Sequence, residues 1–136
     1  NDNPINLAEV SKTVAQHDGA VWTTIMSLRR EDAQMLGYDN AKAWRDMLRS
    51  KAPDLAKAMG IPLADLRWYA AFHNEGNHPH IHLVSYSVGK EPYMTEQGLQ
   101  TFKSDFAHEI FKNDFLLQKG TFLFGVLINC KRNSGK

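Results

Sequence analysis

Four histidines within ten residues are the part of this sequence best suited to chemistry. They are His73, His78, His80 and His82. Imidazole nitrogens bind divalent transition metals and exchange protons near neutral pH. The residues around them alternate between apolar and polar types, which is typical of two strands, 66–73 and 80–87, joined by a loop at 74–79. The sequence therefore predicts an antiparallel hairpin that carries the histidines.

Alternation along these strands places apolar side chains on one face and mostly polar side chains on the other, because successive side chains point to opposite faces of a sheet. One face collects apolar side chains suited to lie under helices: Leu66, Trp68, Ala70, Phe72, Ile81 and Leu83. The other, which we call the histidine face, collects Arg67, Tyr69, Ala71, His73, His80, His82, Val84 and Tyr86. The titratable groups are thus expected together, on the face opposite the core.

Spacing selects three of the four histidines as a metal-binding set. His80 and His82 are about 6.6 Å apart along one strand, whereas His78 and His82 are roughly 13 Å apart. His73 is expected across the hairpin from His80, at roughly 5 Å. The set His73, His80 and His82 leaves metal positions open for water or substrate, as in catalytic sites. The alternative is a group of sheet histidines that bind nothing.

Two further residues of the hairpin are expected beside the metal rather than on it. Glu75 is the nearest carboxylate and could orient an imidazole through its second nitrogen. The alternative for Glu75 is a solvated acid in a loop. His78 is expected to be a neighbour of the three ligands.

The elements that must position this hairpin follow from apolar spacing and from capping residues. Helices are expected at 6–16, 30–36 and 40–50, the last capped by Asp39 or Asn40. Pro53 is expected to begin a further short helix that Gly60 ends. Thr95 can cap a long helix that runs to residue 117 or 118, and 21–28 is predicted to be a strand. The order predicts an α+β fold, an antiparallel sheet with helices packed on one face.

Composition limits the class of protein. The chain has 136 residues, 43% of them apolar, which suits one domain with its own core. Sixteen Lys and Arg against fifteen Asp and Glu give no bulk attraction to nucleic acid, and no apolar run approaches the roughly 18 residues of a membrane helix. A single cysteine, Cys130, excludes an internal disulfide and fits a reducing compartment.

Several strings in the sequence resemble one known family. They are SLRREDA (27–33), LGYDN (36–40), AWR (43–45) and RWYAAFH (67–73), followed by the histidines at 80 and 82. The histidine spacing resembles the third motif of relaxases in the HUH endonuclease superfamily, and the strings resemble the MobL group of mobilisation relaxases from Gram-positive bacteria. The resemblance covers roughly residues 21–115. It implies a ferredoxin-like elaborated fold for residues 1–120, as part of a relaxase domain, and leaves 121–136 as an atypical C-terminal tail.

The resemblance also implies a reaction and its partners. Such enzymes nick single-stranded DNA at a transfer origin, with a divalent metal on three histidines and a 5′-phosphotyrosyl intermediate. The metal would be Mg²⁺ or Mn²⁺ in function, although imidazole ligands also suit Mn²⁺, Ni²⁺, Co²⁺ or Zn²⁺ in a crystal. Implied too are a cytoplasmic location in a bacterial, Gram-positive host and accessory mobilisation proteins as partners. Membranes are not.

The family's nucleophilic tyrosine is expected upstream of Asn1, because the four tyrosines present are better explained as structural. Phosphate contacts are expected from the basic side chains Arg29, Arg30, Lys42, Arg45 and Arg49, although a solvated helix face explains the last three equally well.

Two other interpretations stay open. A histidine-triad nucleotide hydrolase would use His80 as a metal-free nucleophile, but Pro79 interrupts its pattern and His73 has no role there. A non-catalytic remnant of a relaxase would bind metal and DNA without cutting.

Overall fold

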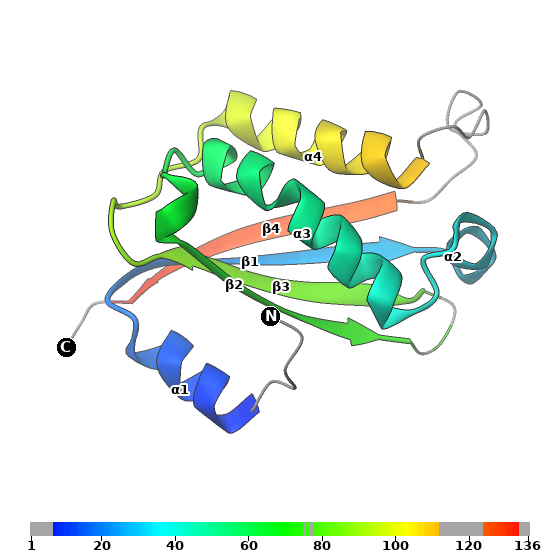
Figure 1. Ribbon diagram of the computed structural model, residues 1–136, viewed down its shortest axis with the longest axis horizontal. Coiled ribbons are helices and arrows are strands. Elements are labelled where there is room, and N and C mark those ends of the chain that lie inside the picture. The colour runs from blue at the N-terminus through cyan, green and yellow to red at the C-terminus, as the bar shows by residue number, and fades with distance from the viewer. Residues whose placement is uncertain (1–6, 75, 77, 112–123, 134–136) are drawn as a thin grey trace.

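The computed structural model describes residues 7–74, 76, 78–111 and 124–133 (Figure 1). In chain order the elements are α1 (Leu7–Gln16), β1 (Gly19–Leu28), α2 (Arg30–Leu36), α3 (Ala41–Ala58), a 3-10 turn η1 (Leu63–Asp65), β2 (Leu66–His73), β3 (His80–Ser87), α4 (Glu96–Phe111) and β4 (Phe124–Asn133). The α+β class and the histidine hairpin are as predicted. No helix in the described ranges is long and apolar enough to cross a bilayer.

The four strands form one antiparallel sheet in the order β2-β3-β1-β4. β1 pairs along its whole length with β4, from Gly19 opposite Asn133 to Leu28 opposite Phe124. Most of the segment 121–136, expected to be an atypical tail, thus forms an edge strand of the sheet.

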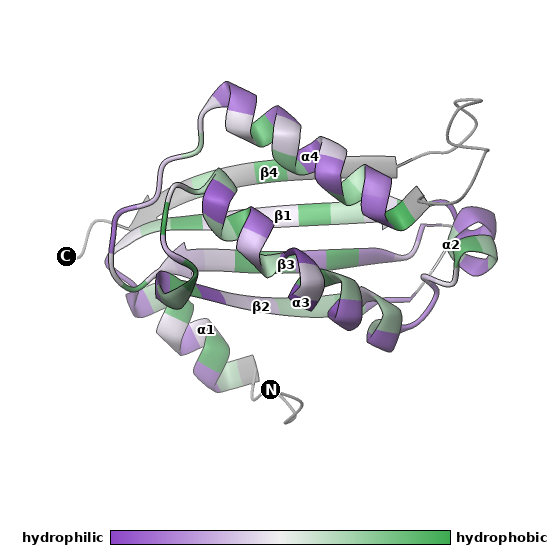
Figure 2. Cartoon of the chain, turned by 45° about the horizontal axis from the view of Figure 1, so that its top comes forward, coloured by the Kyte–Doolittle hydropathy of each residue, from purple (hydrophilic) through white to green (hydrophobic). Residues whose placement is uncertain are grey.

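Helices α3 and α4 cover the apolar face of the sheet (Figure 1). Both helices are amphipathic, with hydrophilic and hydrophobic residues alternating along them (Figure 2). Their buried side chains and those of the strands form one core: Trp44, Met47, Leu48, Phe102, Phe106 and Ile110 with Met26, Leu28, Ile81 and Leu83. Burial of this apolar surface is the main force that fixes the layers. The histidine face points away from these two helices.

The predicted break before Pro53 is wrong, because α3 runs without interruption from Ala41 to Ala58 with Pro53 inside it. Proline removes the hydrogen bond to the carbonyl four residues earlier. Here Pro53 lies on the exposed side of the helix. Leu55 and Ala56, by contrast, are buried and extend the apolar stripe of the helix. Packing therefore outweighs the local cost of the proline.

The helix ends use the expected capping groups. Asn40 Oδ1 accepts the amide of Ala43 at 2.9 Å, and Thr95 Oγ1 accepts the amide of Gly98 at 2.9 Å. Such caps satisfy amides that have no partner inside the helix. The predicted end of the last helix, at residue 117 or 118, lies outside the described residues.

Candidate metal centre

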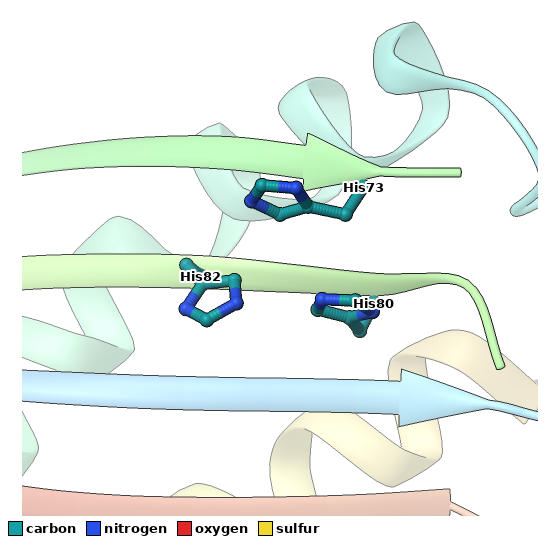
Figure 3. Close-up of side chains that lie close together, drawn as sticks. All are labelled: His73, His80 and His82. Carbon is teal, nitrogen blue, oxygen red and sulfur yellow. The ribbon is translucent and has the colours of Figure 1, made fainter. Parts of the chain in front are cut away.

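The histidine hairpin has the register that the sequence predicted. His73 lies directly opposite His80, and Ala71 lies opposite His82. The three rings gather over β2 and β3 on the histidine face (Figure 3). Their centroids are 5.0 Å apart for His73 and His80, 4.8 Å for His73 and His82, and 5.1 Å for His80 and His82.

This spacing brings the possible ligand atoms close to one another. One nitrogen from each of His73, His80 and His82 lies within 4.8 Å of the others, and all three residues are partly buried. Nitrogens bound to one ion at about 2.1 Å would lie about 3 Å apart. The three nitrogens are thus close enough together for the group to be a candidate site for one ion.

A backbone contact fixes the tautomer of one candidate ligand. The carbonyl oxygen of His78 lies 3.1 Å from Nδ1 of His80. A carbonyl only accepts, so Nδ1 must carry the proton and Nε2 keeps its lone pair. The Nε2 atom of His80 is thus the one prepared to bind a metal. His78 acts here through its main chain, while its own side chain is exposed.

The surroundings favour the neutral form of His82. Burial lowers the pKa of His82, and the neighbouring His73 and His80 lower it further. Neutral imidazole is the form that donates a lone pair to a metal.

The loop between the ligand strands is tied to the junction of β1 and α2. The Leu28 amide donates to the Pro79 carbonyl at 3.2 Å. The Arg30 guanidinium donates to the carbonyl of Gly76 and to the side chain of Asn74. Sequence reasoning assigned Arg30 to DNA and missed this contact, because its partners are more than forty residues away in the chain. Glu75, predicted to orient an imidazole, lies outside the described residues.

The other predicted basic residues do not approach the histidines in this way. Arg29 pairs with Asp32 at 3.0 Å, and Lys42 pairs with Asp46 at 2.6 Å. Lys42, Arg45 and Arg49 belong to α3, whose packed side covers the apolar face of the sheet. The structure therefore places this stripe in the layer opposite the histidine face.

Three of the four tyrosines pack against other aromatic rings, and the fourth, Tyr93, is exposed. Tyr86 is only 3% exposed, with the His17 ring 4.4 Å and the Tyr69 ring 6.5 Å from its own. Burial and the Tyr69 hydrogen bond raise the pKa of Tyr86 to about 12, which disfavours a phenolate. Tyr38 packs on Trp44 in the core layer, and Tyr93 is 75% exposed in the connection between β3 and α4. Tyr69 lies two positions along β2 from Ala71, the residue opposite His82, or about 6.6 Å along the strand.

Comparison with known proteins gives one informative match. A family model of MobL relaxases matches residues 2–119. A search of curated proteins finds no match. Among solved structures, the de novo designed protein Foldit4 aligns with a TM-score of 0.40 and 12% identity over 83% of this chain and 99% of that one, too low a score to support an argument. Because the family match spans most of the sequence, the chain belongs to the MobL relaxases, a family of plasmid mobilisation proteins.

Proposed function

We propose that this chain forms the metal-binding centre of a DNA-nicking relaxase of the HUH type. In this proposal His73, His80 and His82 hold a divalent cation that meets the scissile phosphate of single-stranded DNA at a transfer origin. The observation that carries the proposal is the convergence of three imidazoles, with ligand atoms within 4.8 Å, on the face of the sheet turned away from α3 and α4 (Figure 3).

The donor set fits a divalent transition metal. Three nitrogen ligands from the protein leave further coordination positions open, which is typical of catalytic sites. A cation bound there supplies positive charge for the phosphate oxygens and the in-line geometry of phosphoryl transfer. Nitrogen donors suit Mn²⁺, Ni²⁺, Co²⁺ and Zn²⁺, and Mn²⁺ or Mg²⁺ is proposed for the cell.

The residues beside the three imidazoles leave room for a substrate strand. Ala71 lies opposite His82, is exposed and carries only a methyl group. On the other side of β3, Ser27 lies opposite His80 and Ile25 opposite His82. Small and medium side chains thus flank the ligands, so an extended phosphodiester backbone can approach them along the histidine face.

Metal titration tests the ligand assignment. Wild-type protein titrated calorimetrically with Mn²⁺ or Zn²⁺ should bind one ion. Replacement of His82 by alanine should weaken binding by at least the roughly 10–100-fold typical of losing an outer partner of a metal ligand. His78→Ala and His108→Ala are the matched controls, since neither side chain belongs to the three-histidine group. Wild-type affinity in His82→Ala would contradict the proposal.

DNA binding and cleavage give an independent test. An oligonucleotide with a transfer-origin sequence should bind in a metal-dependent way, and its affinity should fall as salt rises. We expect no covalent adduct, because the environments of the four tyrosines disfavour attack on a phosphate at the histidines. An adduct at Tyr69 or Tyr86 would refute that expectation. Metal-free capture of a nucleotide monophosphate by His80 would instead support a histidine-triad hydrolase.

A further inference from the structure

We propose that Arg30 is a positioning residue for the metal centre, which holds the β2–β3 loop so that His73 and His80 stay opposed. This inference rests on the proposed function and deepens it. It reassigns a basic residue that the sequence alone assigns to DNA.

The contacts of Arg30 are directed at the loop backbone. Its Nε and Nη2 atoms donate to the Gly76 carbonyl at 3.2 and 2.8 Å, and Nη1 donates to the Asn74 side-chain oxygen. Three nitrogens of one planar guanidinium are thus engaged by two loop residues. Helix α2, which begins at Arg30, lies at the same end of the sheet as this loop (Figure 1).

The loop connects two of the three candidate ligands directly. His73 is the residue before Asn74, and His80 is the residue after Pro79. The His80 side has its own anchor, because Pro79 is fully buried and its carbonyl accepts the amide of Leu28. Among the described residues, the His73 side is paired only with His80 of β3, and Arg30 adds contacts with Asn74 and Gly76 next to it.

The third ligand is held in a different way. His82 lies two residues inside β3 and is paired on both sides, with Ala71 of β2 and Ile25 of β1. Loss of Arg30 should therefore loosen His73 most and leave His82 in place. A metal that must order a loosened ligand binds more weakly, because the lost conformational freedom is subtracted from its binding free energy.

A lysine should not replace this arginine. The planar guanidinium offers donors in a fixed fork, whereas an ammonium is a single point charge on a flexible stem. A phosphate contact, by contrast, would tolerate lysine well. A comparison of Arg30→Ala with Arg30→Lys therefore distinguishes two roles of Arg30. Lysine cannot replace arginine in positioning the loop, but it can replace arginine as a positive charge.

The experiment measures Mn²⁺ affinity and amide hydrogen exchange of the metal-free protein. Both variants should lose about 10–100-fold in metal affinity and exchange faster at residues 74–78, with an unchanged thermal midpoint. Arg67→Ala is the matched control, since Arg67 donates to the backbone carbonyls of Ala64 and Leu66 at the far end of β2. This control should match wild type in both measurements.

Two results would overturn the inference. One is wild-type metal affinity and wild-type loop exchange in Arg30→Ala. The other is full recovery of metal affinity in Arg30→Lys, which would assign Arg30 a role through its charge. If wild-type protein binds no metal, the proposed function fails, but the exchange measurement still decides whether Arg30 holds the loop.

Discussion

Neighbouring residues on the histidine face lie in different environments. His80 and His82 are partly buried beside His73 and keep nitrogens available, whereas Tyr86 is covered by His17 and Tyr69. Alternation along the strand predicts only that His80, His82 and Tyr86 share one face. What separates them is burial and contact from other elements, which no local pattern contains.

Tyr86 should make stability sensitive to alkaline pH. Its pKa is raised to about 12 in the folded protein by burial and by the Tyr69 hydrogen bond, against about 10 when unfolded. The stabilisation linked to this group is therefore complete below pH 10 and is lost as the pH rises through 12. Tyr86→Phe should reduce the fall in urea midpoint between pH 10 and 12.

The exposed Tyr93 provides the control for this measurement, because Tyr93→Phe should leave the alkaline slope unchanged. An identical slope in wild type and Tyr86→Phe would show that the Tyr86 hydroxyl does not govern this transition.

At the scale of the elements, α3 shows a conflict between local propensity and packing. Pro53→Ala should stabilise the protein by about 1–2 kcal/mol, because it restores a helical hydrogen bond and loses only part of that gain to a more flexible unfolded chain. Chemical denaturation measures the change. Lys57→Ala, at another exposed position of α3, is the control and should change stability by less than about 0.5 kcal/mol. A lower stability in Pro53→Ala would indicate that the proline ring packs favourably.

Elements whose signals are local could be predicted from the sequence. The strands β2 and β3, their register and the caps Asn40 and Thr95 follow from alternation and from residue type. The continuity of α3 through Pro53 could not, because Leu55 and Ala56 are buried by a partner layer that the helix sequence does not describe. The Arg30 contact could not either, since its cause lies in tertiary proximity.

At the scale of the whole molecule, β4, the last described segment of the chain, pairs with β1, the first strand. Ile128 lies opposite Thr24 of β1 and packs against the core cluster. Proline at this position would remove a main-chain donor and impose its own backbone angle on the pairing. Ile128→Pro should therefore destabilise the fold by several kcal/mol, measured by chemical denaturation.

The conservative variant Ile128→Val is the control and should cost no more than about 1.5 kcal/mol. If residues 121–136 were only an appended tail, Ile128→Pro would leave the unfolding midpoint unchanged. That outcome would contradict the pairing of β4 with β1.

One face of the sheet packs into the hydrophobic core, and the other carries the three histidines. Met26, Leu28, Ile81 and Leu83 belong to the core formed with α3 and α4, while the three histidines lie on the other side of the sheet (Figure 3). Substitutions of the three partly buried histidines therefore remove little of the apolar burial that keeps the chain folded. Such a division favours evolvability: the side chains around the three histidines can change while the opposite face keeps the protein folded, and a designer can alter that surface for the same reason.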